Sequence, residues 1–116
     1  MTAINLADKL ATFSEHWQPR TVGQFNGHDL MVAKVKGEFT WHKHDDTDDF
    51  FMVLQGRLKI ELRDKDIWLG PGELCVVPMG VEHRPVAEEE VHLQRAFVRM
   101  MSGFHGNSPP CASFSM

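Results

Sequence analysis

A chain of 116 residues is long enough for one domain with its own hydrophobic core and too short for two ordinary domains. Hydrophobic residues make up 42% of the chain and charged residues 24%, which is typical of a folded protein and not of a disordered one. The formal net charge is −4 and no basic block occurs, so we expect no nucleic-acid partner. We expect no membrane partner either, because the longest uninterrupted apolar run, Phe50 to Leu54, is far too short to cross a bilayer.

The N-terminal residues predict one short helix over Ile4 to Glu15, with Asn5 as its N-cap and Pro19 beyond its end. Three apolar residues share one helical face, which should pack on the body of the domain: Leu6, Leu10 and Phe13.

Two features bear on the compartment of the protein. The segment Met1 to Leu10 contains Asp8 and Lys9 in place of a long apolar run, so we expect no signal peptide. We interpret Cys75 and Cys111, the two cysteines, as free thiols in a reducing compartment, which favours a cytoplasmic location.

From residue 21 onward, short apolar stretches alternate with turn residues, among them Asn26-Gly27, Gly70-Pro71-Gly72 and the acidic Glu88-Glu89-Glu90. Short strands without a second helix predict an all-β sandwich or barrel over 21–101, after an N-terminal helix and lead-in over 1–20. Residues 102–116 are rich in Gly, Ser and Pro without periodicity, so we expect a loose C-terminal tail there.

The histidines of one short segment carry the strongest chemical signal. His42 and His44 are two positions apart, so on a strand both imidazoles would point to the same face. A third histidine from a later strand, His83, and a carboxylate would complete a mononuclear metal site. The alternative is a strand with two partly exposed histidines, and the pairing with His83 favours the metal site.

Two segments resemble the motifs of a known family. The segment from Gly37 to Gly56 (GEFTWHKHDDTDDFFMVLQG) resembles the first cupin motif, G(X)5HXH(X)3-4E(X)6G. The segment from Gly72 to Ala87 resembles the second, G(X)5PXG(X)2H(X)3N. The chain is thus similar to a small single-domain cupin, which implies a jelly-roll barrel (a double-stranded β-helix) with a metal in its mouth. The resemblance also implies four metal ligands: His42, His44, Asp49 and His83.

The sequence departs from the family pattern at three places. Four residues separate Gly37 from His42, where the pattern has five. Asp49 stands at the position of the glutamate and is one methylene shorter, and Ala87 replaces the final asparagine. Asp49 also ends an acidic run that begins at Asp45, so a solvated loop carboxylate is the alternative to a ligand role.

Mixed histidine and carboxylate ligation suits one divalent ion per subunit, which could be Fe, Mn, Ni, Co or Zn. Protonation of the histidines should weaken its binding. Five other polar side chains could meet a ligand inside the barrel: Thr40, Gln55, Arg84, Gln94 and Arg95. For each arginine we favour a solvated charge at a strand end over a substrate anchor.

Two strands, one carrying His42 and one carrying Asp49, should be apolar on the face that points away from the site. The outward side chains would be Phe39, Trp41, Phe50, Met52 and Leu54. We expect the N-terminal helix to cover part of this surface and a second subunit to cover the rest in a homodimer, with coverage by the N-terminal segment alone as the alternative.

The sequence leaves more than one function open. A metalloenzyme could act on a small molecule by dioxygenase-like or Lewis-acid chemistry, although the chain has no tyrosine to serve as a general acid. A non-catalytic, metal-dependent module that binds or senses a small molecule is the alternative, and a fold that keeps its histidines without metal is a third. Fold analogy cannot decide between the first two, and we favour the enzyme.

Overall fold

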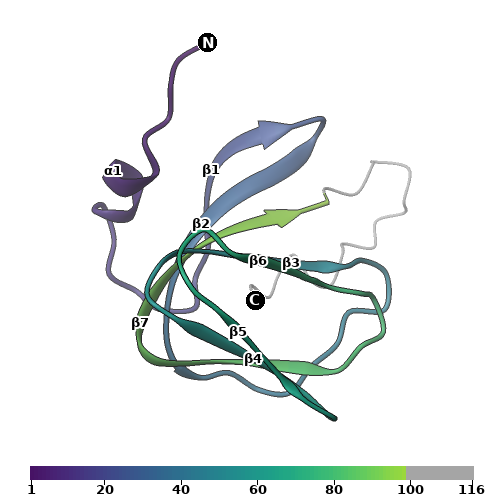
Figure 1. Ribbon diagram of the computed structural model, residues 1–116. Coiled ribbons are helices and arrows are strands. Elements are labelled where there is room, and N and C mark those ends of the chain that lie inside the picture. Colours follow the sequence, from purple (N-terminus) through teal and green to yellow (C-terminus); the bar gives the residue numbers. More distant parts are fainter. Residues whose placement is uncertain (99–116) are drawn as a thin grey trace.

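The computed structural model describes residues 1–98, which form one short helix and seven strands (Figure 1). The elements are, in chain order, α1 (Leu6–Leu10), β1 (Arg20–Phe25), β2 (His28–Glu38), β3 (Asp49–Gln55), β4 (Leu58–Leu62), β5 (Asp66–Leu69), β6 (Leu74–Val77) and β7 (His83–Phe97). These strands pair in antiparallel fashion throughout, which confirms the predicted all-β class with a short N-terminal helix. The tail predicted for 102–116, with Cys111 and His105, lies outside the described residues.

The long strand β7 joins the two layers of the barrel. Its first residues pair with β4 and its later residues with β3, while β2 runs beside it along most of its length. One layer contains β1, β2, β7, β3 and β6 in that order, and β4 with β5 continues the sheet from the other end of β7. Figure 1 shows β3 and β6 above β4 and β5, with the curved β7 linking them at the left. This is the jelly-roll barrel that the motifs imply.

The core lies between the two layers because apolar residues alternate along the strands. In β3, Phe51 and Val53 are fully buried, whereas Phe50 and Met52 are half-buried on the other face, as strand parity predicts. Burying one such side chain contributes about 1.5–3 kcal/mol, so this core fixes the strands that carry the site. Its buried members are Ala33, Val35, Phe51, Val53, Leu58, Ile60, Leu69, Val77, Ala87, Val91 and Leu93.

The helix is shorter than predicted: α1 covers Leu6–Leu10, not Ile4 to Glu15. The N-cap is confirmed, since the side chain of Asn5 accepts a hydrogen bond at 2.9 Å from the backbone N–H three residues later. The helix ends early because the N–H and the hydroxyl of Thr12 both donate to the carbonyl of Lys9, at 3.1 and 2.6 Å. No helix within residues 1–98 has the length and apolar character needed to cross a membrane.

The helical segment packs on the outside of the barrel, as expected. Leu10 and Phe13 are buried there with Val32 of β2, and Leu54 of β3 packs against the same cluster. The chain straightens after the turn at Thr12, which lets Phe13 reach the sheet.

Three of the five outward-facing apolar side chains are covered by the chain itself. Leu54 packs in the cluster beneath α1. Phe39 packs against the barrel core, and its ring stacks on Trp17 with centroids 4.9 Å apart. Trp41 lies under the guanidinium of Arg63, at 3.8 Å. The N-terminal helical segment therefore covers part of this surface, as expected, while Trp17 and Arg63 cover Phe39 and Trp41, for which a second subunit was expected.

The acidic run Glu88–Glu90 was expected to mark a turn, but it lies inside β7. The register between β2 and β7 shifts at this point, so that the three glutamates are exposed in a bulge. Gly56 lies against the bulge with φ of 92°, and a Cβ added there would be 2.9 Å from the carbonyl oxygen of Glu90. Only glycine fits this position, and the bend lets β7 pass from one layer to the other.

Candidate metal centre

The His-x-His pair lies on an extended segment between β2 and β3, which is not the continuous strand expected from parity. An isolated bridge pairs His42 with His83 at the start of β7, and each donates its N–H to the carbonyl of the other, at 3.0 and 2.9 Å. The backbone N–H of Gly80 donates to the carbonyl of His44 at 2.7 Å. These backbone bonds hold the two histidine-bearing segments side by side.

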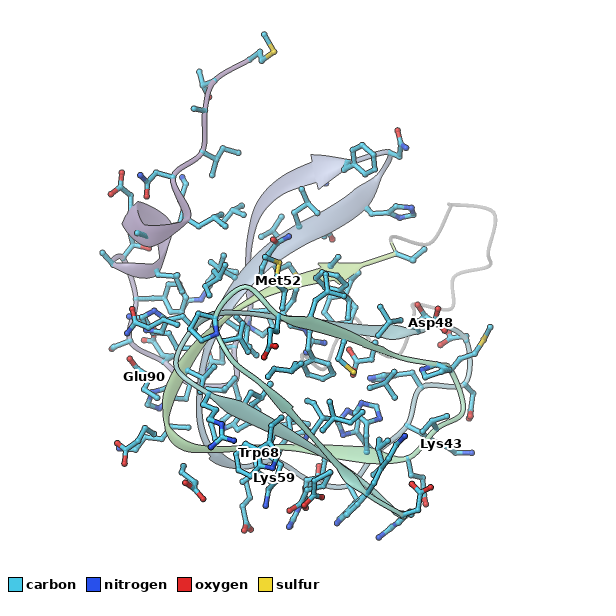
Figure 2. All side chains as sticks on the ribbon, in the orientation of Figure 1. Lys43, Asp48, Met52, Lys59, Trp68 and Glu90 are labelled. Atoms are coloured by element: carbon cyan, nitrogen blue, oxygen red, sulfur yellow. The ribbon has the colours of Figure 1, made fainter. Side chains whose placement is uncertain are left out.

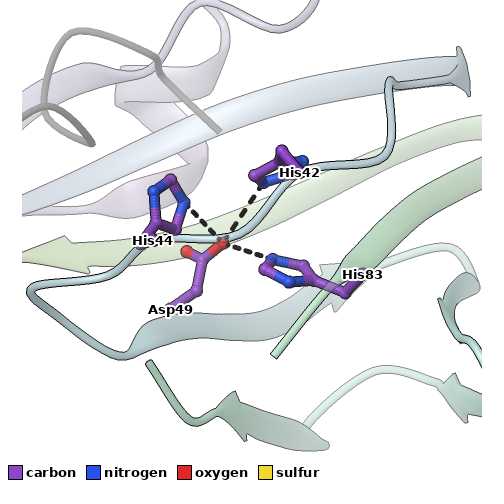
Figure 3. A group of neighbouring side chains, drawn as sticks. All are labelled: His42, His44, Asp49 and His83. Atoms are coloured by element: carbon purple, nitrogen blue, oxygen red, sulfur yellow. Dashed lines mark hydrogen bonds and ion pairs between the residues drawn. The ribbon is translucent and has the colours of Figure 1, made fainter. Parts of the chain in front are cut away.

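Four side chains meet inside the barrel: His42, His44, Asp49 and His83 (Figure 3). One carboxylate oxygen of Asp49, Oδ2, lies 2.8 Å from Nε2 of His83, 3.3 Å from Nε2 of His44 and 3.7 Å from Nε2 of His42. One possible ligand atom from each residue lies within 4.8 Å of the others. Two donors at about 2.1 Å from one ion are separated by at most roughly 4.2 Å, so the cluster is close to the size that a single ion requires.

Backbone carbonyls orient two of the three rings. Nδ1 of His42 lies 2.9 Å from the carbonyl oxygen of Thr40, and Nδ1 of His83 lies 2.8 Å from that of Val81. A ring that donates from Nδ1 keeps the lone pair of neutral imidazole on Nε2, the atom that faces Asp49. Nε2 of His42 is buried and has no hydrogen-bond partner within residues 1–98. Such a nitrogen fits a site that a metal ion completes.

The cluster is shielded from solvent on most sides. The side chain of His42 is 17% exposed, whereas those of the other three members are at most 4% exposed. The rings of Phe39 and Phe51 stand edge-on to His42 and His83, with centroids 5.3 and 6.0 Å apart. A small ligand would therefore reach the cluster from the side of His42.

Asp49 is a buried carboxylate. Burial alone would raise the pKa of Asp49, but the Arg95 guanidinium and then the three nearby imidazoles outweigh it and hold this pKa far below its ordinary value. Asp49 therefore remains an anion at any pH near neutrality. Although it is shorter than glutamate, its Oδ2 reaches the three imidazole nitrogens directly.

Arg95 is the residue of this site that the sequence interpretation placed wrongly. We expected a solvated charge, but its side chain is completely buried and Nη2 donates to Oδ1 of Asp49. The guanidinium lies 4.2 Å from the ring centre of Phe51 and 5.2 Å from that of Phe97. The available signal was parity, since Arg95 alternates in step with Leu93 and Phe97 on the buried face of β7.

The other four polar candidates lie outside the barrel interior. Thr40 and Gln55 are exposed, and Gln94 has the half-buried outer parity of β7. Arg84 forms an ion pair with Glu61 at 2.8 Å, as a charge on the outer wall. Arg95 is thus the single member of the five that approaches the cluster.

The acidic loop before Asp49 lies at the surface, where Asp45, Asp46 and Asp48 are all exposed. Oδ1 of Asp48 accepts a hydrogen bond from the N–H of Met79 at 3.0 Å. The loop is thereby tied to the turn that precedes the third histidine.

Two further histidines have structural partners. His16 and His92 contact the two carboxylate oxygens of Glu90, at 2.7 and 3.1 Å. Hydrogen bonds from His16 first and then from His92 lower the pKa of Glu90. Both contacts give these two histidines a structural role, and His28 begins β2 without joining the metal-ligand group.

The sequence matches one family model and two curated proteins. The family model described as "Cupin domain" matches residues 29–97. The uncharacterized protein YdbB of Bacillus subtilis is 34% identical over 83 residues, which cover 71% of this chain and 67% of YdbB. Acireductone dioxygenase 4 of Arabidopsis thaliana is 39% identical over 72 residues, which cover 56% of this chain but only 38% of the dioxygenase.

A solved structure agrees with these matches. The crystal structure of a cupin-2 domain containing protein from Shewanella frigidimarina has a TM-score of 0.81 and 45% sequence identity, covering 83% of this chain and 94% of that one. Since the family model covers more than half of the residues and the fold is the same antiparallel barrel, the chain belongs to the cupin domain family.

Proposed function

We propose that this cupin binds one divalent metal ion per subunit through His42, His44, Asp49 and His83. The observation that carries the proposal is that the possible ligand atoms of these four buried or half-buried residues lie within 4.8 Å of one another. Three imidazole nitrogens and one carboxylate oxygen suit Fe, Mn, Ni, Co or Zn.

The proposed activity is that of a small-molecule metalloenzyme. A divalent ion with free coordination positions can activate O2 together with a bound substrate, or polarise the substrate as a Lewis acid. The similarity to acireductone dioxygenase 4 supports the oxygen chemistry, although it covers only part of that enzyme. The protein's own contribution is to orient two imidazoles through Thr40 and Val81 and to exclude water with Phe39 and Phe51.

A non-catalytic module that binds or senses a small molecule through the metal is the second candidate. The interior supports it because, within residues 1–98, the buried polar side chains are His44, Asp49, His83 and Arg95. Three of these are proposed ligands and the fourth is paired with Asp49, so no separate acid or base stands ready for proton transfer. O2 consumption with catechol-like or thiol substrates would favour the enzyme, whereas saturable binding without turnover would favour the module.

Elemental analysis of protein purified anaerobically without added metal tests the proposal. We expect about one ion per chain in the native protein and a large loss in H42A, H44A and H83A. H16A is the matched control, because His16 contacts Glu90 and lies outside the metal-ligand group. Equal metal content in all four variants would contradict the proposed site. Iron in the native protein would support oxygen chemistry, and zinc or nickel would support Lewis-acid chemistry or binding.

We also propose a homodimer formed through the outer face of β3 and β6. Phe50 lies opposite Val76 and Met52 lies opposite Leu74, so these four apolar side chains share one face. Leu74 and Val76 are 54% and 48% exposed, and Figure 2 shows Met52 on the outer side of this layer. A second copy related by a twofold axis would cover the same patch on both subunits.

Light scattering of the native protein at micromolar concentration should give twice the mass of one chain. V76K should give the mass of one chain without loss of folding, because Val76 points outward. A native protein that is monomeric would exclude the dimer.

We propose a cytoplasmic location on the basis of Cys75. The structure has this residue as a free thiol, and burial followed by the nearby charge of Asp49 raises its pKa, so it is a poor nucleophile. A reducing compartment suits such a thiol. Cell fractionation with an antibody to the protein would test the location, and recovery outside the cytoplasmic fraction would contradict it.

A further inference from the structure

The two oxygens of Asp49 have different partners. Oδ1 accepts a hydrogen bond from Nη2 of Arg95, while Oδ2 is the oxygen that lies near the three imidazoles. A carboxylate is planar and rigid, so fixing one oxygen fixes the direction of the other. Arg95 therefore fixes the orientation of the Asp49 carboxylate through the oxygen that does not face the histidines.

Arg95 is itself held firmly enough to act as such an anchor. Its side chain is fully buried, and the guanidinium packs over the rings of Phe51 and Phe97 at 4.2 and 5.2 Å. Both phenylalanines are buried, so neither ring can move without disturbing the core. A planar guanidinium stacked in this way presents its N–H groups in one direction.

We propose that Arg95 is a positioning residue of the metal site, which holds Asp49 so that Oδ2 alone is presented to the ion. The proposal rests on the metal binding proposed above. In this arrangement Asp49 binds through one oxygen, because Oδ1 is committed to Arg95. The short side chain of Asp49 has the length needed to contact Arg95 with one oxygen and the imidazoles with the other.

Charge repulsion between Arg95 and the metal ion would change the metal affinity in the opposite direction to positioning. A buried guanidinium near a divalent ion repels it, so a site without Arg95 would bind metal more tightly if repulsion were dominant. If positioning is dominant, the site without Arg95 binds metal more weakly, because the carboxylate is free to turn away. The direction of the change in affinity therefore separates the two effects.

The test measures Co²⁺ affinity by competition with a chelator, together with the visible absorption spectrum of bound Co²⁺. We expect R95Q to bind Co²⁺ about 10- to 100-fold more weakly than the native protein, as for other residues that orient a metal ligand. The absorption bands should shift in R95Q, and R95K should restore part of the affinity. R84Q is the matched control, because Arg84 lies on the same strand and pairs with a carboxylate outside the barrel.

A second variant keeps the proposal testable if R95Q does not fold, as judged by circular dichroism. D49E leaves Arg95 in place and lengthens the ligand by one methylene. We expect at least tenfold weaker Co²⁺ binding in D49E, because a longer carboxylate cannot satisfy the arginine and the ion at the same separation. Equal or tighter binding in D49E would overturn the positioning role.

Failure of the positioning role and failure of the proposed metal binding would give different results. A folded R95Q with unchanged affinity and spectrum, or with tighter binding, would overturn the proposal while leaving the metal site intact. A native protein that takes up no Co²⁺ or other divalent ion would overturn the proposed function itself, and the positioning role with it. Loss of affinity in R84Q equal to that in R95Q would show a general effect of removing charge from β7 and would also overturn it.

Discussion

The strand β7 carries two arginine–carboxylate pairs in opposite surroundings. Arg95 and Asp49 form a pair inside the barrel, with side chains 0% and 1% exposed. Arg84 and Glu61 form a pair on the outer wall at 2.8 Å, with side chains 25% and 16% exposed. Figure 2 shows Lys59, a further partner of Glu61, on the outside of β4.

Both pairs join a guanidinium to a carboxylate, and they differ in how much water reaches them. Water screens the outer pair, so its net contribution to stability is small, about 0–1 kcal/mol. The inner pair has lost its hydration, and each member depends on the other to offset that cost. The two carboxylates also have different further neighbours. Glu61 forms a second ion pair with Lys59, whereas Asp49 lies beside three imidazoles. The inner pair is therefore the one whose disruption should matter most.

Removing one member of the inner pair should have the largest effect on stability. We expect D49A to lower the free energy of unfolding of the metal-free protein by about 3–5 kcal/mol, because the buried guanidinium of Arg95 loses its ion pair with Asp49. Urea denaturation in the presence of a chelator measures this change. E61A is the matched control and should lose no more than about 1 kcal/mol. Similar losses in both variants would show that burial does not distinguish the two pairs.

Replacing both members of the inner pair by apolar residues should restore much of that stability. We expect the double variant D49V/R95M to unfold within about 1–2 kcal/mol of the native metal-free protein, because no buried charge remains. Its metal content should nevertheless be lost. This result would show that the pair serves binding and not folding. A double variant as unstable as D49A would show instead that the pair is required for the fold.

Much of the inner site could be predicted from the sequence, because short motifs fix its geometry. The motif spacing brings together His42, His44 and His83, and the parity of β3 turns Asp49 toward them, although the segment of His42 is not a regular strand. Arg95 was misplaced because a charged residue on an apolar face is ordinarily solvated. Its burial depends on Asp49, which is 46 positions away in the chain, and sequence periodicity carries no information on such a pairing.

The sequence also did not predict where the helix and the strands depart from regular structure. The early end of α1 depends on a hydrogen bond from the hydroxyl of Thr12, and the covering of Phe39 depends on the ring of Trp17 from a distant segment. The run Glu88–Glu90 has the composition of a turn, but pairing on both sides of it keeps the strand continuous through a bulge. In each case tertiary contacts override the local preference.

Removing one member of the outer pair should have a small effect that depends on salt. We expect R84Q to lose less than about 1 kcal/mol of unfolding free energy at low ionic strength, and almost nothing in 1 M salt, where the Debye length is about 3 Å. Urea denaturation at the two salt concentrations provides the measurement. A loss that is large and independent of salt would mean that Arg84 is effectively buried, which would remove the contrast with Arg95.

The smallest effect should be the response of the two carboxyl groups to acid. A hydrogen bond from Lys59 first, and then contacts with Arg84, lower the pKa of Glu61 below its ordinary value of 4.5. A lowered folded-state pKa means that the contribution of Glu61 is complete above 4.5 and is lost as the pH falls through the folded-state pKa. The pKa of Asp49 is also lowered in the folded protein, and by much more than that of Glu61. Asp49 should therefore remain ionised while Glu61 takes up its proton. Carbon-13 resonances of the two carboxyl groups, followed in the metal-free protein as acid is added, test this order. Protonation of Asp49 before Glu61 would mean that the guanidinium of Arg95 does not compensate for burial, and the inner pair would then have no electrostatic advantage over the outer one.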